Sequence, residues 1–241
     1  MNLVIDMGNT ALKFAVFSQR EMLKSGGFDY SGVEDLADQI KEFTLSACIL
    51  SAVTNIPPRL PGFLREKCKL LVLDADTPLP IVNNYGGPAT LGHDRLANAC
   101  GAAALFPQSD ALVIDAGTCL KFDFIRGGAV YEGGAISPGL HMRYRALHQG
   151  TAQLPLLQPR AMNPLLGKDT PGSMHSGVVN GMLAEINGIV QQYSESSPRL
   201  QVLLTGGDMN FFLNQLKSRI FAAPHLTLQG LNGILLHQAH D

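Results

Sequence analysis

The sequence predicts an α/β protein whose second half repeats the pattern of its first half. An apolar strand that ends in aspartate, turns through glycine and continues into the letters LKF occurs twice, as VIDMGNTALKF from Val4 and as VIDAGTCLKF from Val113. Short apolar strands also alternate with segments of helical periodicity along the chain. Proline and polar residues separate the two copies near 107–110, so we expect one domain at 1–108 and another at 109–241.

The first half is predicted to open with a hairpin. Two apolar segments, 2–6 and 11–18, are joined through Gly8 and Asn9, residue types that favour a tight turn. Apolar spacing and proline breaks place the later elements of this half as follows: a helix at 33–43 with Ser31 available as its cap, strands at 47–53 and 69–74, and an alanine-rich buried helix at 93–106 that ends before Pro107.

The second half is predicted to begin with the same strand, turn and strand. Glycine turns and apolar periodicity then give the remaining elements: a glycine-punctuated strand within 127–139, a long helix at 172–196, a strand within 200–208 that ends in a glycine turn, an amphipathic helix at 209–220, a short strand at 225–228 and a terminal helix at 230–240.

Composition and charge exclude several classes of protein. The chain of 241 residues has a formal net charge of -2, which provides no basic field for a nucleic acid. Its apolar runs are shorter than the roughly 20 residues that span a membrane. The opening residues lack the three regions of a signal peptide, and the four cysteines lie far apart, without metal-ligand spacing. We therefore expect a cytoplasmic protein without a nucleic-acid or membrane partner.

The repeated turn is the feature that carries chemistry. A strand that ends in aspartate and turns through glycine presents backbone N–H groups, a hydroxyl and a carboxylate at one point, which suits a phosphate chain and its metal. An ordinary hairpin turn is the alternative, but such a turn does not require the shared LKF. The second turn is one residue shorter, so the two lysines need not point alike. The groups are Asp6, Gly8, Asn9, Thr10 and Lys13 in the first copy, and Asp115, Gly117, Thr118 and Lys121 in the second.

Two further motifs add candidate groups. TGGD at 205–208 is a third glycine turn at a strand end, where a ring or a phosphate can approach the backbone. GHDR at 92–95 brings Asp94 and Arg95 to a predicted helix start. The aspartate could accept a proton from an attacking hydroxyl, and the arginine could hold an anionic group. The alternative is a capping carboxylate beside a solvated arginine.

These motifs together resemble one family. DMGNTALK (6–13), GHDR (92–95), DAGT (115–118), GGAISPG (133–139) and TGGD (205–208) occur in the order and spacing of type III pantothenate kinases. That family belongs to the acetate and sugar kinase, Hsp70 and actin superfamily. The resemblance implies two duplicated ribonuclease-H-like (actin-like ATPase) domains, each with a mixed central sheet flanked by helices, and a nucleotide and substrate cleft between them.

The resemblance also implies roles for single residues. Asp94 would be the general base for the primary hydroxyl of pantothenate, Asp115 would hold a monovalent cation (K⁺ or NH₄⁺), and Mg²⁺ would lie near Asp6. The implied ATP contacts are Asp6, Met7, Gly8, Asn9, Thr10, Ala11, Leu12, Lys13 and Thr118, and the implied substrate contacts are Tyr85, Gly92, His93, Asp94, Arg95 and Thr170. Two departures from the family pattern are Cys119 after DAGT and the pair Pro171 and Gly172, which is expected to loosen the helix start beside Thr170.

The predicted function is therefore phosphorylation of pantothenate by ATP to 4'-phosphopantothenate, the first step of coenzyme A synthesis, carried out by a homodimer. Two alternatives remain open at the level of sequence. One is another small-molecule kinase of the same superfamily, because strand-end phosphate turns do not select the acceptor. The other is an ATP-binding regulatory protein without turnover.

Overall fold

The chain forms two compact units, which are described separately. The computed structural model describes residues 1–8, 11–29, 33–216 and 219–238. Unit 1 comprises Met1–Gln108, Gly127–Glu132 and His225–Asp241, and unit 2 comprises Ser109–Arg126 and Gly133–Pro224. The first segment of unit 1 ends within the predicted boundary region, whereas residues 127–132 and the C-terminal segment, both expected in the second half, group with unit 1.

Unit 1 is built on a mixed five-stranded sheet in the order β3-β2-β1-β4-β5. The hairpin predicted from the sequence is present, because β1 pairs antiparallel with β2, and β2 pairs antiparallel with β3. Beyond β1 the strands are parallel. The strands are β1 (Asn2–Met7), β2 (Leu12–Ser18), β3 (Glu21–Phe28), β4 (Ala47–Ala52) and β5 (Lys69–Val72).

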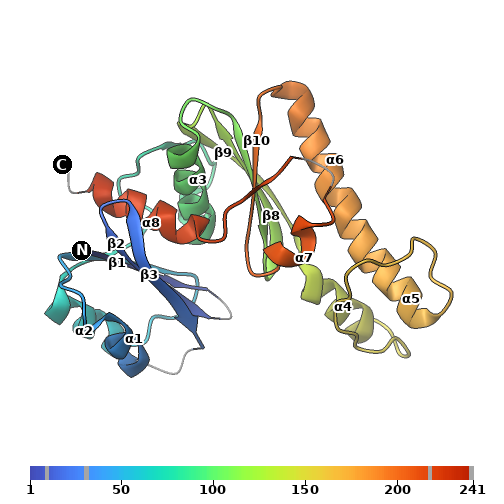
Figure 1. Cartoon of the computed structure of the whole chain (residues 1–241), viewed down its shortest axis with the longest axis horizontal. Coiled ribbons are helices and arrows are strands. Elements are labelled where there is room, and N and C mark those ends of the chain that lie inside the picture. Colours follow the sequence, from blue (N-terminus) through green and yellow to red (C-terminus); the bar gives the residue numbers. More distant parts are fainter. Residues whose placement is uncertain (9–10, 30–32, 217–218, 239–241) are drawn as a thin grey trace. The chain divides into compact units, whose positions relative to one another are not determined.

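Helices cover both faces of this sheet (Figure 1). On one side lie α1 (Val33–Ile40) and α2 (Arg59–Lys67), which pack on alternate residues of the strands, among them Leu3, Ile5 and Met7. On the other side lie α3 (His93–Leu105) and α8 (Leu226–His237). Because successive residues of a strand point to opposite faces, Asp6 lies on the face opposite Ile5 and Met7.

The two helices α3 and α8 approach each other closely. A Cβ built on Gly230 would lie 1.7 Å from the Ala97 carbonyl oxygen, and one built on Gly101 would lie 2.7 Å from the Leu226 carbonyl oxygen. Only glycine permits backbones to pack at this separation. This contact explains why the C-terminal helix belongs to unit 1, and why the chain needs an alanine-rich helix at α3.

Unit 2 repeats the sheet of unit 1. Its strands are β7 (Ala111–Ala116), β8 (Cys119–Arg126), β9 (Val130–Pro138), β10 (Gln201–Thr205) and β11 (Phe221–Ala222). Their order is β11-β10-β7-β8-β9, with the short β6 (Val82–Asn83) beside the first residues of β9. Within this sheet β7 and β8 are antiparallel, and β10 is parallel to β7 and to β11. The order from β9 to β11 is that of β3 to β5, so the repeat in the sequence is a repeat of topology.

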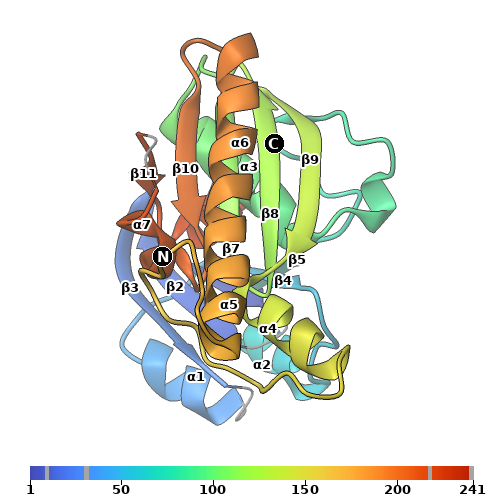
Figure 2. The ribbon, with the colours of Figure 1, turned by 90° about the vertical axis from the view of Figure 1, so that its right-hand side faces the viewer.

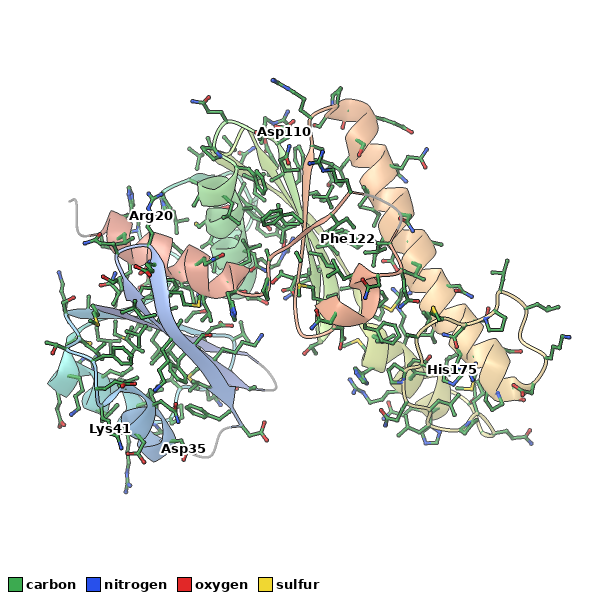
Figure 3. All side chains as sticks on the ribbon, in the orientation of Figure 1. Arg20, Asp35, Lys41, Asp110, Phe122 and His175 are labelled. Atoms are coloured by element: carbon green, nitrogen blue, oxygen red, sulfur yellow. The ribbon has the colours of Figure 1, made fainter. Side chains whose placement is uncertain are left out.

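One long helical column covers a face of the unit 2 sheet (Figure 2). It consists of α5 (Thr170–His175), a π-helical turn (Ser176–Asn180) and α6 (Gly181–Ser196), which lies lengthwise over β7. Two shorter helices, α4 (Leu140–Gln149) and α7 (Met209–Leu213), complete the layer. The core between helices and sheet contains Phe122, labelled in Figure 3, together with Ile186 and Val190.

Some predicted elements differ in the structure. The strand predicted at 225–228 is wrong: Leu226 and Leu228 are buried in the first turn of α8, because contact with α3 outweighs the local strand pattern. The helix predicted at 209–220 ends after Leu213. The sequence reading also missed β3, α2, α4 and β11. In α2 the proline at position 61 is tolerated because it lies in the first turn, where backbone N–H groups lack helical partners. In the part of the chain that the structure describes, the helices are too short or too polar to cross a bilayer.

Candidate active site

The two hairpins place the same residue types in the same register. In unit 1, Asp6 at the end of β1 faces Lys13 on β2 and Ser51 on β4. In unit 2, Asp115 at the end of β7 faces Lys121 on β8 and Thr205 on β10. The second turn is one residue shorter than the first, but the strands on either side keep the same register. In the first turn the Gly8 N–H donates to Ala11 O, and in the shorter second turn the Gly117 N–H donates to Cys119 O. Each half thus sets an aspartate between a lysine and a hydroxyl.

The first hairpin holds its aspartate by a hydroxyl. Asp6 is only 8% exposed, and its Oδ1 accepts a hydrogen bond from Ser51 Oγ at 3.3 Å. Lys13 is exposed, and its ammonium has no ion-pair partner within the described residues. The expected contacts Asn9 and Thr10 lie outside the described residues. The side chains of Met7 and Leu12 are buried in the core, so a nucleotide could reach these two residues only through their backbone.

The GHDR segment forms the start of α3. Gly92 is the N-cap residue, and Asp94 lies in the first turn with its Oδ1 accepting the Arg95 N–H at 2.9 Å. A Cβ on Gly92 would lie 2.7 Å from that same Oδ1. The glycine therefore makes room for the carboxylate to fold back over the helix start, where unpaired N–H groups favour a negative charge.

The residue after Asp94, Arg95, forms a cluster with two tyrosines in unit 1. The Arg95 guanidinium carbon is 5.6 Å from the centre of the Tyr85 ring, and the ring of Tyr131 is 6.1 Å from that of Tyr85. Arg95 is only 4% exposed, so the alternative of a solvated arginine is wrong. Among the described residues, the buried Nδ1 of His93 has no hydrogen-bond partner. The structure thus brings five predicted substrate residues together: Tyr85, Gly92, His93, Asp94 and Arg95.

The second hairpin holds its aspartate by an ion pair. Lys121 Nζ lies 2.8 Å from Asp115 Oδ2, and the two side chains are only 14% and 12% exposed. The other carboxylate oxygen faces the glycine turn: a Cβ on Gly206 would lie 2.6 Å from Asp115 Oδ1, and one on Gly117 would lie 3.5 Å from it. The register therefore makes the two lysines equivalent in backbone position, while their surroundings differ.

Three glycine motifs of unit 2 meet at this hairpin. A Cβ on Gly139 would lie 2.3 Å from Gly117 O and 2.4 Å from Thr118 O, and Gly206, at φ +98°, packs against Ala116 O. The Asp208 N–H bonds the Ala116 carbonyl at 2.8 Å. DAGT, GGAISPG and TGGD are therefore one glycine-lined surface in space. Such a surface lets an anion or a flat ring approach the backbone closely, because no Cβ atoms stand in the way.

Asp208 stands at the rim of this surface. Its Oδ1 is 3.8 Å from His141 Nε2. Burial raises the pKa of Asp208, the negative charge of Asp115 raises it further, and His141 partly opposes both. Asp115 and Asp208 are therefore close enough in unit 2 to influence each other electrostatically.

The helix start at Thr170 is regular. Asp169 is the N-cap residue, its Oδ1 accepts the Gly172 N–H at 2.6 Å, and Pro171 occupies the first turn, where proline is favoured. The expectation that Pro171 and Gly172 loosen this helix start is therefore wrong. The other two expected contacts of unit 2, Thr118 and Thr170, are both exposed.

The sequence reading missed the hydroxyl partners and the ion pair. Ser51 in ILSAV and Thr205 in LLTGG occupy equivalent strand ends, each beside its aspartate. Aligning these two strands, as the two hairpins were aligned, would have found both residues. The pairing of Lys121 with Asp115 had no comparable signal, because the first hairpin has the same residue types without that ion pair.

Comparison with known proteins adds the family. A family model described as type III pantothenate kinase matches residues 2–192. A type III pantothenate kinase of Christiangramia forsetii is 41% identical over 239 residues, covering 98% of this chain and 98% of that protein. One from Bacteroides fragilis is 41% identical over 236 residues, with 98% and 97% covered, and one from Flavobacterium psychrophilum is 35% identical over 240 residues, with 99% and 100% covered.

Solved structures share the fold. A Campylobacter jejuni protein described as a Baf family transcriptional activator matches with a TM-score of 0.61 at 21% identity, covering 99% of this chain and 100% of that one. A Listeria monocytogenes protein assigned as an N-acetylmannosamine kinase matches with a TM-score of 0.54 at 12% identity, with 99% of each chain covered. At such identities the likeness concerns the fold alone. With the repeated strand order, it confirms the predicted pair of ribonuclease-H-like, actin-like ATPase domains.

The family model covers most of the chain, and the relatives align with it from end to end. The motifs that the family resemblance rested on are also the segments that form the two hairpins, the start of α3 and the glycine surface. This chain belongs to the type III pantothenate kinase family.

Proposed function

We propose that this chain transfers the γ-phosphoryl group of ATP to the primary hydroxyl of pantothenate, giving 4'-phosphopantothenate and ADP, the first step of coenzyme A synthesis. Family membership supports the reaction. The observation that carries the mechanism is the Asp94 carboxylate, held at the start of α3 next to the buried Arg95.

Asp94 acts as the general base. Its Oδ1 is oriented by the Arg95 N–H, and Gly92 leaves space beside it. As the new O–P bond forms, the carboxylate takes the proton of the hydroxyl, and ADP leaves with the electron pair of the broken bond. Phosphoryl transfer demands positioning more than early deprotonation, so a carboxylate suffices as the base.

Tyr85, His93 and Arg95 position the acceptor in this proposal. The guanidinium of Arg95 lies over the Tyr85 ring, which fixes its plane for binding an anionic substrate group or the transferring phosphoryl. The buried Nδ1 of His93, which lacks a partner among described residues, is available to a polar group of the acceptor. Thr170 is proposed as a further substrate contact.

The strand-end hairpins bind ATP. In unit 1, the backbone of residues 6–8 and 11–13 and the exposed Lys13 ammonium contact the phosphates. In unit 2, Thr118 and the glycine surface of Gly117, Gly139 and Gly206 are proposed as a second surface that a nucleotide can approach. In this proposal, the Lys13 ammonium compensates the negative charge of the phosphates, and the glycines let the nucleotide approach the backbone closely.

The residues present fit Mg²⁺ near Asp6. Magnesium in kinase sites uses one or two carboxylates together with substrate phosphates, and it needs no all-protein cage. The described residues contain no cluster of three or more His, Cys, Asp or Glu side chains, and Asp6 offers a single buried carboxylate at a strand end. We therefore assign Asp6 to Mg²⁺–ATP. When bound, the metal neutralises phosphate charge.

The residues present do not fit the monovalent cation expected at Asp115. The carboxylate oxygen Oδ2 already holds the Lys121 ammonium at 2.8 Å, and Oδ1 faces the Gly206 backbone. A bare K⁺ or NH₄⁺ at Asp115 would have to share that carboxylate with a like charge.

A homodimer formed mainly through the second half is also proposed. Unit 2 exposes apolar side chains that a partner would cover, with Ile136 at 61%, Leu165 at 84% and Leu166 at 73% exposure. Exposed apolar side chains of this kind are typical of association surfaces. Light scattering should give twice the chain mass of 25.8 kDa, and a monomer at working concentration would contradict this part. The cytoplasmic location expected from the sequence stays a prediction.

A coupled ADP-release assay with and without pantothenate tests the reaction. Pantothenate-dependent ADP release is expected, and Asp94→Asn should lower kcat by at least about 10²-fold, the low end of a general-base contribution. ATP binding by this variant, measured by thermal shift, should stay normal and serves as its control. Near-normal kcat would remove Asp94 from the role. ADP release only with a sugar or acetate would indicate another kinase, and ATP binding without turnover would indicate a regulatory protein.

A further inference from the structure

We propose that the Lys121 ammonium is a built-in monovalent cation at Asp115, so that this chain turns over ATP without added K⁺ or NH₄⁺. This inference rests on the proposed kinase function. It starts from the poor fit between the expected cation and the residues present. It assigns a fixed positive charge to the end of β7.

The geometry places an ammonium where an external cation would bind. Lys121 Nζ lies 2.8 Å from Asp115 Oδ2, a distance typical of a charge-assisted hydrogen bond. Both side chains are largely buried, at 14% and 12% exposure. A lysine ammonium is a compact +1 charge with three donors, so it carries the same formal charge as K⁺ or NH₄⁺.

The carboxylate requires such a charge. An ionised carboxylate removed from water is strongly destabilised unless it is paired. Asp208 adds negative charge on the same side, because Asp115 and Asp208 interact electrostatically. His141 lies 3.8 Å from Asp208 and is a cation only when protonated. Lys121 therefore supplies permanent positive charge directly to Asp115.

The tether makes this charge independent of salt. Lys121 is fixed on β8 directly opposite Asp115 in the strand register, so its ammonium binds intramolecularly. The occupancy of an intramolecular partner does not depend on bulk concentration. An added cation would have to displace the ammonium and leave it buried beside a like charge, which is unfavourable.

The first hairpin shows that register alone does not produce this pair. Lys13 faces Asp6 in the same register, yet its side chain is exposed, and no ion pair joins it to any described residue. Asp6 is bonded by Ser51 instead. The ion pair is thus a property of the second site, where Asp115 Oδ1 faces a glycine turn and Oδ2 faces the lysine.

The decisive experiment measures pantothenate-dependent ADP release in choline, K⁺ and NH₄⁺ salts at a constant ionic strength of about 0.1 M, so that screening is unchanged. The wild-type rate should differ by less than about twofold among the three salts. In choline, the rate of Lys121→Met should be at least about tenfold lower than that of the wild type, and K⁺ or NH₄⁺ should restore most of it. Lys121→Arg retains a charge and should remain indifferent to the salt. Lys13→Met should lose activity equally in all three salts.

A second readout does not require turnover. In the absence of nucleotide, K⁺ should raise the Tm of Lys121→Met above its value in choline, because a cation bound only by the native state stabilises that state. The Tm of the wild type and of Lys13→Met should be the same in both salts.

Wild-type activation of tenfold or more by K⁺ would overturn the proposal and leave the kinase function intact. The proposal would also be overturned if the rate and the Tm of Lys121→Met were the same in choline as in K⁺. If no salt yields pantothenate-dependent ADP release, the proposed function fails, while the Tm comparison still decides whether Lys121 replaces a cation.

Discussion

The hairpins β1–β2 and β7–β8 share strand order, register and residue types, but the aspartate and the lysine of each hairpin make different contacts. Asp6 receives a hydrogen bond from Ser51 and leaves Lys13 exposed. Asp115 forms a buried ion pair with Lys121. A duplicated backbone therefore preserved the positions of the chemical groups, whereas the neighbouring turns divided their roles. The exposed lysine lies in the first half, and the lysine engaged with a carboxylate lies in the second.

The strands next to the two hairpins explain much of this difference. After Ser51 the first half continues with Ala52 and Val53, whereas after Thr205 the second half continues with Gly206 and Gly207. Gly206, at φ +98°, lets its backbone approach Ala116 O and Asp115 Oδ1. A glycine turn thus packs against the second hairpin, and the first half has no glycines at the equivalent positions.

The largest expected effect comes from closing that turn with a side chain. Gly206→Ala would place a Cβ 2.2 Å from Ala116 O at a positive φ, so overpacking and backbone strain add. The free energy of unfolding, measured by urea titration, should fall by about 3 kcal/mol or more. The matched control is Gly207→Ala, whose Cβ would meet nothing within 4 Å. Equal losses in the two variants would contradict the role assigned to Gly206.

An intermediate effect is expected at the exposed lysine. Lys13→Ala should lower kcat/KM for ATP by about 10- to 10²-fold, because it removes one charge-assisted phosphate contact. The free energy of unfolding should change by less than about 0.5 kcal/mol, since the side chain is exposed. Lys121→Ala should differ in stability: besides the loss of rate expected in choline salts, its free energy of unfolding should fall clearly there, because Asp115 loses its buried ion-pair partner. If Lys13→Ala unfolds as easily as Lys121→Ala, the division between the two lysines is wrong.

The smallest effect concerns a hydrogen-bonded pair in unit 2 that contains a histidine. Tyr144 Oη and His175 Nδ1 are 2.8 Å apart and buried, and His175 is labelled in Figure 3. Burial lowers the pKa of His175 below its ordinary value of 6.5, the charge of Arg160 lowers it further, and Asp169 partly opposes them. The stability contributed by neutral His175 is therefore complete above that ordinary value and is lost as the pH falls toward the lowered value.

Chemical unfolding between pH 7 and pH 5 should show this loss. His175→Gln should be less stable at neutral pH by about 1 kcal/mol through the altered hydrogen bond, and its stability should vary less over this pH range. A variant with the wild-type slope would show that other groups set the acid response.

Most of the fold follows from local pattern. Short apolar runs located β1, β2, β7, β8 and β10, the alanine-rich composition located α3, and the helical spacing of apolar residues located α6. Prediction failed where tertiary contact outweighed that pattern: Leu226 and Leu228 read as a strand, but the close glycine contact between α3 and α8 places them in a helix. Proline in a sequence usually predicts a break, but position 61 lies in the first turn of α2, where proline is tolerated, so this helix has no clear signal in the sequence.

Within the candidate site, the motifs indicated which residues matter and not how they are paired. The cluster of Tyr85 with the GHDR segment was predicted, and the structure brings these residues together in unit 1. The burial of Arg95 was not predicted, because burial depends on residues distant in the sequence, such as Tyr131. The regular start of α5 was not predicted, because it depends on the side chain of Asp169, which caps the helix by accepting the Gly172 N–H.

The sequence by itself determined the duplication, the family and the groups that could do chemistry, because these are written in residue types and spacings. Only the tertiary structure decided which lysine is exposed and which is paired. Charge pairing depends on the distance between side chains and on their removal from water. Both are set by the strands and glycine turns that surround each hairpin, so two nearly identical stretches, VIDMGNTALKF and VIDAGTCLKF, acquired different electrostatics.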